Sequence, residues 1–169
     1  MSDIIRYKYI YQTPCGFDNL ILQSDGTYLT ALCFDCSRDV KKLCGCASEN
    51  PSVFSDAVKW LDIYFRGEIP SFTPKYRIES LTPFRSRVID IMLKIPYGKT
   101  VTYKNIADEI ACEKGTEKMS AQAVGGAVGF NPICIIVPCH RVMGTNGKLT
   151  GYGGGIKNKE MLLKLEGII

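Results

Sequence analysis

Two kinds of hydrophobic spacing follow one another along the 169 residues, and their order limits the folds that the chain can adopt. Residues 4–11, 19–23 and 28–34 are rich in Ile, Leu, Tyr and Phe, which predicts three strands. Asp25-Gly26, between the second and the third, is a hairpin signal. Over residues 54–66 apolar residues recur at helical spacing, which predicts a helix. Its apolar stripe consists of Phe54, Val58, Leu61 and Phe65.

Prolines interrupt this pattern at residues 69–74, which predicts a linker. We place a domain boundary near residue 80, so that residues 1–80 form an N-terminal domain and residues 81–169 a C-terminal one. The second domain opens with a helix, because Thr82 can cap it and Pro83 suits its first position. The buried stripe of this helix is expected at Val88, Ile89, Met92 and Leu93.

Two more helices are predicted, one capped by Thr102 and one by Ser120. The second of them, residues 121–130, consists mostly of Ala, Gly, Val and Gln. Such small side chains let the backbone approach another surface closely, and that surface could be a neighbouring helix or DNA. A short helix, a turn and a small-residue helix are typical of a helix-turn-helix.

The chain has a single histidine, His140, and it follows Cys139 in the run IIVPCHRV, residues 135–142. A cysteine with an ordinary pKa of about 8.5 is only a few per cent thiolate at neutral pH, but an imidazole could take its proton. An arbitrary pair of this kind is more often an inert core cysteine beside a polar residue. Neighbours in a strand also point to opposite faces, so the pair needs a bend or a helix start to cooperate. Pro138 favours a bend, because it ends the strand-like run before the pair.

The run around Cys139 resembles the active-site signature of the O6-alkylguanine-DNA alkyltransferases, also called methylated-DNA–protein-cysteine methyltransferases. Further segments fall at the spacing of that family: GKTVTY at 98–103, AVGGA at 123–127, Asn131-Pro132, GYGG at 151–154 and LLKLEG at 162–167. The resemblance is close over most of residues 82–167, and over residues 1–80 only the layout matches.

For the fold, the resemblance implies an α/β N-terminal domain with a ribonuclease-H-like sheet and a helix. A mainly α C-terminal domain with a winged helix-turn-helix would follow. For function it implies direct-reversal DNA repair, in which the alkyl group of O6-alkylguanine is transferred to Cys139, stoichiometrically and irreversibly. O4-alkylthymine is a second candidate substrate. The partner would be double-stranded DNA with the alkylated base flipped out, bound by a monomer in the cytoplasm at the nucleoid, and no cofactor is implied.

The same resemblance assigns the catalytic roles. His140 would take the proton of Cys139 through a water, and Glu166 would orient His140. Tyr103 would donate to the base, and Asn131 would tie the helix to the active-site turn, although Asn131 is equally natural as a helix C-cap. Substrate-binding candidates are Val142, Tyr152, Gly153 and Gly154, the last three in a flexible loop that could also be a plain turn. We interpret Arg141 as structural or phosphate-facing.

The family typically inserts an arginine from its DNA-binding helix into the gap left by the flipped base, and here Gln122 stands at that position. Glutamine can still intercalate and form hydrogen bonds, but it lacks the cationic guanidinium, so we expect weaker duplex binding. The helix would lie in the minor groove, where it needs few sequence-specific contacts. Further candidate DNA contacts are Ala121, Ala123, Gly125, Arg85 and Thr145.

Composition limits the remaining possibilities. No apolar run approaches the roughly 18–20 residues of a membrane span, and the N-terminus lacks a signal-peptide pattern, so no membrane is expected. Without a secretory signal, the eight cysteines suggest a reduced chain. Cys33, Cys36, Cys44 and Cys46 could form a zinc site, but the second spacing is tight and we expect spare thiols and no metal. Phosphate-loop and dinucleotide-binding motifs are absent.

Charge leaves more than one function open. Residues 1–80 carry nine Lys/Arg and ten Asp/Glu, whereas residues 81–169 carry twelve and seven. A basic second half suits a nucleic-acid surface, and it is equally common in domains without such a partner. Two rivals to alkyl transfer are a non-catalytic lesion-binding sensor or regulator and a cysteine hydrolase, which would need an oxyanion hole.

Overall fold

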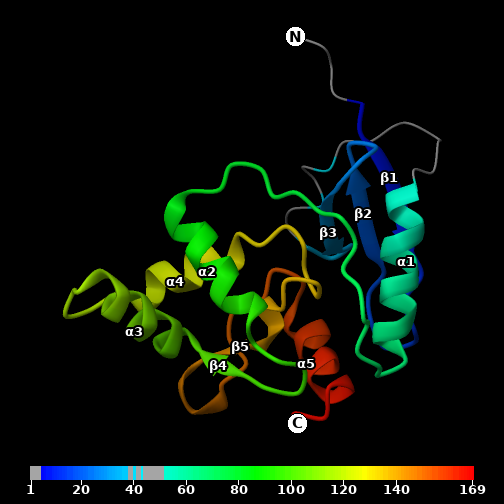
Figure 1. Ribbon diagram of the computed structural model, residues 1–169. Helices are drawn as coiled ribbons and strands as arrows, with labels where there is room; N and C mark the ends of the chain where they lie inside the picture. The colour runs from blue at the N-terminus through cyan, green and yellow to red at the C-terminus, as the bar shows by residue number, and fades with distance from the viewer. Residues whose placement is uncertain (1–4, 38–39, 41–42, 44–51) are drawn as a thin grey trace.

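The computed structural model describes residues 5–37, 40, 43 and 52–169. Its first half is an antiparallel sheet in the order β1 (Tyr7–Tyr11), β2 (Leu20–Ser24) and β3 (Leu29–Phe34), with α1 (Ser52–Phe65) against it. Figure 1 shows this sheet and helix on one side of the molecule and the helices of the second half on the other. The three strands and the helix lie close to their predicted positions.

The predicted hairpin connects β2 and β3. Asp25 Oδ1 accepts hydrogen bonds from the backbone N–H groups of Thr27 (2.9 Å) and Tyr28 (2.8 Å), and Gly26 has a φ of 98°. A positive φ of this kind suits glycine, which explains the Asp-Gly signal in the sequence.

The buried face of α1 differs from the predicted stripe. Phe54 and Leu61 are buried as expected, but Val58 and Phe65 are only half-buried. The helix is turned so that Trp60 and Tyr64 enter the core instead, where their rings stack with centroids 5.4 Å apart. The larger aromatic rings bury more apolar surface, which favours this rotation.

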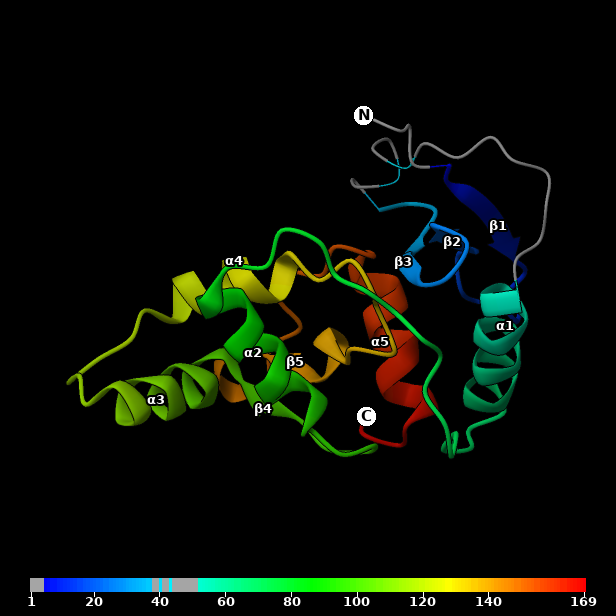
Figure 2. The ribbon, with the colours of Figure 1, turned by 45° about the horizontal axis from the view of Figure 1, so that its top comes forward.

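The second half is mainly helical. Its helices are α2 (Pro83–Leu93), α3 (Tyr103–Lys114), α4 (Ala121–Gly129) and α5 (Ile156–Leu165). A short parallel pair, β4 (Val101–Thr102) and β5 (Val142–Met143), and two 3-10 turns, η2 (Cys139–Arg141) and η3 (Thr145–Gly147), complete it. Figure 2 shows α4 above α2, with α3 at the outer end of this half, and α2 contacts both α3 and α4. None of the helices in the described residues is long and apolar enough to cross a membrane.

All three predicted helix caps are confirmed. The hydroxyl of Thr82 accepts from the N–H of Arg85 (3.2 Å), Thr102 forms a capping box with Asn105, and the hydroxyl of Ser120 accepts from the N–H of Ala123 (3.2 Å). These bonds satisfy N–H groups that a helix start leaves without a partner.

Two details of the second half differ from the prediction: which residues of α2 are buried, and where α4 ends. Leu93 is 45% exposed, whereas Ile91 is 5% exposed and takes its place in the core. Residue 91 follows residue 88 by three positions and therefore lies on the same face of α2. Helix α4 ends at Gly129 and Phe130 is its C-cap, one residue earlier than predicted.

Ile135 and Ile136 form a turn between the bridged residues Cys134 and Val137, and the strand-like reading of this run is wrong. The N–H of Ile136 donates to the carbonyl of Cys134 (2.8 Å), and Ile135 has a φ of 70°. The run is apolar because its side chains are buried. A short buried run cannot be assigned to a strand by hydrophobicity alone.

The outer edge of β3 joins the two halves. The N–H of Leu32 donates to the carbonyl of Pro132, and the N–H of Cys134 donates to the carbonyl of Leu32, each at 2.8 Å. One hydrophobic cluster includes residues from both halves. The sheet of the first half therefore supports the segment that leads directly to Cys139.

Candidate active site around Cys139

Cys139 is the first residue of η2 and follows Pro138 at a bend of the backbone. This is the local geometry that cooperation with His140 requires. Its side chain lines a cavity of about 470 Å³, and the residue is 7% exposed. The cavity is also lined by Asn131, Tyr152, Gly153 and Gly154 from the second half and by Cys33 and Phe34 from β3.

Asn131 holds the turn around the thiol. Its Nδ2 donates to the carbonyl of Val137 (2.9 Å) and to Cys139 Sγ (3.1 Å), and its Oδ1 accepts from the N–H of Ile133 (3.0 Å). The C-cap of α4 is Phe130, so the alternative reading of Asn131 as that cap does not hold. A donor at 3.1 Å from the sulfur stabilises the thiolate.

His140 is fully buried and hydrogen-bonded to Glu166. Its Nε2 lies 2.8 Å from Glu166 Oε1, and its Nδ1 has no hydrogen-bond partner among the described residues. A carboxylate can only accept, so Nε2 carries the proton and Nδ1 offers a lone pair. Burial lowers the pKa of His140, and the neighbouring Glu166 opposes this in part. The imidazole is therefore a neutral base at neutral pH.

The carboxylate of Glu166 receives donors from four residues. They are His140, the hydroxyl of Tyr64 (2.7 Å), the guanidinium of Arg141 (2.9 Å to each oxygen) and the N–H of Gly98 (3.1 Å). Burial alone would raise the pKa of Glu166, but the hydrogen bonds from His140 and Arg141 outweigh it and lower the pKa to about 2. Glu166 is therefore ionised throughout the physiological range.

Arg141 is a structural partner of this carboxylate. Besides Glu166, it binds the carbonyl of Ile95 through Nη1 (2.8 Å), and it is 9% exposed. Of the two predicted readings, the structural one agrees with this geometry, because the guanidinium is buried in a fork-shaped pair with the carboxylate.

Lys159 is a buried cation whose charge acts on the thiol of Cys139. Its Nζ donates to the carbonyls of Val142 (2.6 Å) and Thr150 (3.2 Å), and burial lowers its pKa to about 8. Burial also raises the pKa of Cys139, which the bond from Asn131 and the charge of Lys159 only partly offset. Cys139 is thus a thiol at rest and needs a base, which His140 can supply.

Tyr103 and the glycine-rich loop form the other side of the site. The hydroxyl of Tyr103 donates to the carbonyls of Thr150 (3.4 Å) and Gly151 (3.3 Å). The carbonyl of Gly154 accepts from Asn158 (2.7 Å) and from the thiol of Cys36 (3.3 Å), which ties this end of the loop to the first half.

The glycines of this loop differ in the space around them. A Cβ on Gly154 would lie 2.6 Å from the ring of Phe34, whereas a Cβ on Gly153 would meet nothing within 4 Å. The ring of Tyr152 lies edge-on to Phe34, and its buried hydroxyl interacts with the thiol of Cys139. Gly154 is thus required by close packing, while Gly153 leaves room beside the cavity.

The candidate DNA contacts fall into separate places. Ala121, Gln122 and Ala123 form the exposed first turn of α4, and Thr145 is exposed on η3. Gly125 lies against the ring of Tyr103, since a Cβ there would be 3.9 Å from it. Arg85 is not near Gln122. Its guanidinium lies 3.9 Å from the ring centre of Phe130, at the other end of α4.

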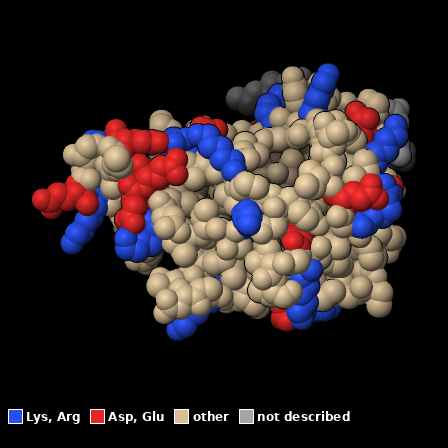
Figure 3. Space-filling model, turned by 60° about the horizontal axis from the view of Figure 1, so that its bottom comes forward, with Lys and Arg blue, Asp and Glu red and all other residues tan. Residues whose placement is uncertain are grey.

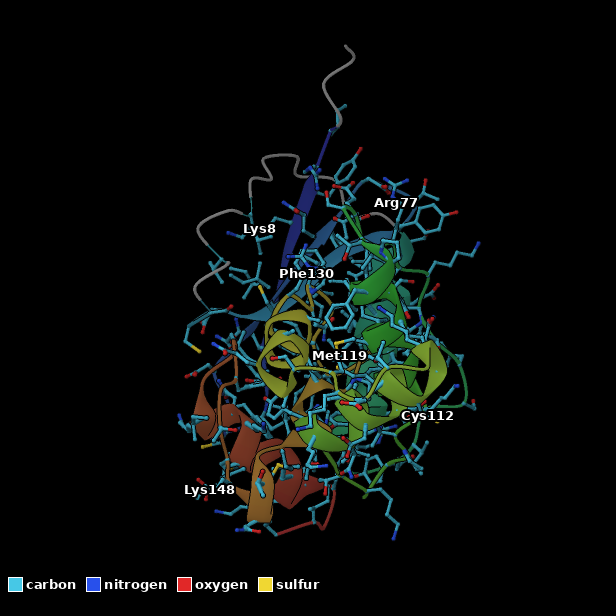
Figure 4. All side chains as sticks on the ribbon, turned by 90° about the vertical axis from the view of Figure 1, so that its left-hand side faces the viewer. Lys8, Arg77, Cys112, Met119, Phe130 and Lys148 are labelled. Atoms are coloured by element: carbon cyan, nitrogen blue, oxygen red, sulfur yellow. The ribbon has the colours of Figure 1, made fainter. Side chains whose placement is uncertain are left out.

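Figures 3 and 4 show the surface positions of these segments. In Figure 4, Phe130 at the end of α4 stands well apart from Lys148 on the loop after β5. In Figure 3, acidic side chains gather at the end of the molecule formed by α3, where Glu109 and Glu113 pair with Arg87. The basic excess of the second half does not extend to that end.

Sequence reasoning missed Tyr64 and Lys159. Lys159 and Asn158 are buried polar residues one turn before Leu162 and Leu163, so i, i+4 spacing places them on the apolar face of α5. Their presence also hid the helix itself, which was not predicted. Tyr64 follows Leu61 by three residues, and a buried tyrosine hydroxyl usually has a hydrogen-bond partner. Both signals were present in the sequence, but neither identifies the partner.

The zinc hypothesis includes Cys44 and Cys46, which lie outside the described residues. Within the described part, ligand atoms of Asp18, Asp35 and Cys36 lie within 4.8 Å of one another. The carboxylate of Asp18 already accepts from the amide of Asn158 (2.7 Å). Exposed acidic groups are common without a metal, so this cluster does not identify one.

The chain is similar to known proteins of one family. Residues 83–168 match the family model described as the 6-O-methylguanine DNA methyltransferase, DNA binding domain. A methylated-DNA–protein-cysteine methyltransferase of Methanosarcina acetivorans is 42% identical over 161 residues, 95% of this chain and 98% of the relative. One of Mycobacterium bovis is 50% identical over 117 residues, 69% and 67% of the two chains.

Solved structures agree with these relatives. The crystal structure of Mycobacterium tuberculosis O6-methylguanine methyltransferase has a TM-score of 0.77 and 40% identity, covering 96% of this chain and 93% of that one. The same protein in complex with DNA also has a TM-score of 0.77 and 40% identity, covering 96% and 92%.

Proposed function

Since the chain belongs to the methylated-DNA–protein-cysteine methyltransferase family, we propose that it repairs DNA by moving the alkyl group of O6-alkylguanine onto Cys139. The observation that carries the proposal is the buried pair of neutral imidazole and ionised carboxylate, whose histidine directly follows the buried thiol of Cys139 in the chain. His140 Nε2 is fixed by Glu166 at 2.8 Å, which leaves Nδ1 as the base. This arrangement follows the logic of a catalytic triad.

The reaction is a displacement at the alkyl carbon. His140 Nδ1 accepts the proton of the thiol through a water, and the thiolate of Cys139 attacks the alkyl carbon. The carbon–oxygen bond breaks, its electrons stay on guanine O6, and the hydroxyl of Tyr103 donates to the base as negative charge develops on it. Asn131 stabilises the thiolate from 3.1 Å. The product is a thioether, so the protein acts once per molecule and needs no cofactor.

Binding would use the helix-turn-helix formed by α3 and α4, with the segment around β4 and β5 as a wing. The exposed first turn of α4 would enter the minor groove, and Gln122 would hold the gap left by the flipped base. Val142, Tyr152, Gly153 and Gly154 would enclose the base, with Thr145 and Arg85 as further contacts. O4-alkylthymine is a second candidate substrate.

The remaining parts of the proposal concern the whole molecule. A monomer suffices, because all residues of the site belong to one chain. The first 80 residues would form a ribonuclease-H-like domain that supports the active-site turn through β3. The DNA substrate favours a cytoplasmic location at the nucleoid.

Mass spectrometry separates this function from its rivals. After mixing with duplex DNA containing O6-methylguanine, the peptide with Cys139 should gain the mass of one CH2 group in a one-to-one reaction. Tight binding without an adduct would indicate a lesion sensor. If the protein shows no binding and no adduct, the cysteine hydrolase remains as the explanation.

Changing Gln122 to arginine should strengthen duplex binding. The added guanidinium would supply a cation and a stacking surface at the gap, worth about one further phosphate-type contact, so the salt dependence of log K should steepen by about one unit. Titration of labelled duplex at several salt concentrations measures both quantities. Gln12→Arg, at an exposed residue of the first half, is the matched control. Equal gains in the two variants would argue against a role for position 122.

A further inference from the structure

Tyr64 reaches the catalytic carboxylate from the other half of the chain. It lies near the end of α1, 102 residues before Glu166, and its hydroxyl donates to Glu166 Oε1 at 2.7 Å. The same hydroxyl oxygen is 3.4 Å from His140 Nε2. Tyr64 is 1% exposed, and its ring packs edge-on against the imidazole with centroids 6.5 Å apart.

The hydroxyl of Tyr64 donates to the same carboxylate oxygen that accepts the hydrogen bond of His140. Glu166 Oε1 accepts from Tyr64, from His140 Nε2 (2.8 Å) and from Arg141 Nη2 (2.9 Å), whereas Oε2 accepts from Arg141 and Gly98. Burial raises the pKa of Tyr64 well above its ordinary value, so the hydroxyl remains a neutral donor. A donor on Oε1 withdraws charge from the oxygen that faces the imidazole.

We propose that Tyr64 is a positioning residue for alkyl transfer, because its hydroxyl holds Glu166 Oε1 against His140 and limits the basicity of that oxygen. The inference rests on the proposed function and names a residue outside the Cys-His-Glu relay. It follows that α1 takes part in the chemistry through the carboxylate. Tyr64 itself touches neither the thiol nor the cavity that the thiol lines.

The charged and polar groups around His140 determine whether its pKa rises or falls when Tyr64 is changed. Glu166 faces it with negative charge, while Arg141 and, from α5, Lys159 face it with positive charge, and Tyr64 faces it from α1. Removing the hydroxyl of Tyr64 leaves more negative charge on Oε1. This favours the imidazolium, so the pKa of His140 should rise in Tyr64→Phe.

The single histidine of the chain makes the test direct. With 15N-labelled histidine, one imidazole is observed, and its titration gives the pKa of His140 without any substrate. We expect a higher pKa in Tyr64→Phe than in the parent. Tyr97→Phe is the matched control, because the hydroxyl of Tyr97 donates to the carbonyl of Leu165 (3.2 Å) and its ring lies 6.1 Å from that of Tyr64. An unchanged or lower pKa in Tyr64→Phe, or an equal rise in Tyr97→Phe, overturns the proposal.

Alkyl transfer provides a second readout. If neutral His140 is the base, the transfer rate of Tyr64→Phe relative to the parent should be lower at pH 6 than at pH 8. A uniform loss at both pH values would indicate a packing role and overturn the proposal. If the parent transfers nothing, the proposed function fails, whereas the histidine titration still tests Tyr64. If Tyr64→Phe does not fold, the unsubstituted protein provides the test. An NMR cross-peak between the hydroxyl proton of Tyr64 and the Nε2 proton of His140 is then expected. Its absence overturns the contact and, with it, the proposal.

Discussion

Cys139→Ser is expected to lose alkyl transfer entirely while it still binds duplex DNA. The hydroxyl of serine is far less acidic than a thiol and a much weaker nucleophile, so His140 cannot activate it to the same extent. The hydroxyl is smaller than the thiol and can still accept a hydrogen bond from Asn131, so the turn around η2 and the exposed face of α4 should remain as they are. Mass spectrometry with O6-methylguanine DNA measures transfer, and a binding titration measures affinity.

The control for this variant is a cysteine outside the cavity. Cys112 is exposed on α3, so Cys112→Ser should transfer one alkyl group per molecule, like the parent. Methyl removal that continues in Cys139→Ser, with the mass appearing on another residue, would contradict the assignment of Cys139 as the acceptor.

Glu166→Gln is expected to damage both stability and transfer. The carboxylate is buried between Arg141 and His140, so its removal leaves the guanidinium as an unpaired buried charge. Losing one partner of such a pair costs roughly 3–5 kcal/mol of unfolding free energy. Transfer should slow by about 10²- to 10⁴-fold, because His140 loses the group that fixes its tautomer and stabilises its charged form.

An exposed glutamate provides the comparison. Glu160 pairs with Lys164 at 2.6 Å across one turn of α5, and both side chains are about half-exposed. Glu160→Gln should therefore change stability by less than about 1 kcal/mol and leave transfer intact. Denaturant unfolding measures the first and single-turnover transfer the second. Similar effects in the two glutamate variants would mean that the buried network has no special importance.

The same carboxylate predicts how stability depends on acid. The pKa of Glu166 falls from an ordinary 4.5 to about 2 on folding. A lowered pKa stabilises the folded chain above the unfolded-state value, and this contribution disappears as the pH falls through the folded-state value. The stability difference between the parent and Glu166→Gln should therefore be full above pH 5 and shrink as the pH approaches 2. A difference that stays constant over this window would contradict the ionised state of Glu166.

Much of the fold could be predicted because its signals are local. Thr82, Thr102 and Ser120 cap their helices as predicted, since a cap needs only one side chain and an N–H group three residues later. The Asp25-Gly26 hairpin is local for the same reason. Local spacing did not give the rotation of α1, which depends on how Tyr64 packs against residues of the other half.

In the candidate site, too, local signals could be read from the sequence and long-range contacts could not. Cys139 and His140 could be proposed from the sequence because they are adjacent in a recognisable run. Glu166 could be proposed because its motif follows at the family's spacing. Tyr64 and Lys159 act through contacts to residues 102 and 17 positions away, which no pattern along the chain encodes. The run at 135–137 was read as a strand because burial in a turn and burial in a sheet select the same apolar residues.

The hydrogen bonds between β3 and the segment around Pro132 have a consequence for folding. Cys139 lies only a few residues beyond that segment, and Glu166 relies on a hydroxyl from α1. We therefore expect that neither half can lose its structure without disordering the segment around Cys139. The molecule should denature cooperatively, in a single step, and a fragment of the second half alone would be a poor substitute for the whole chain.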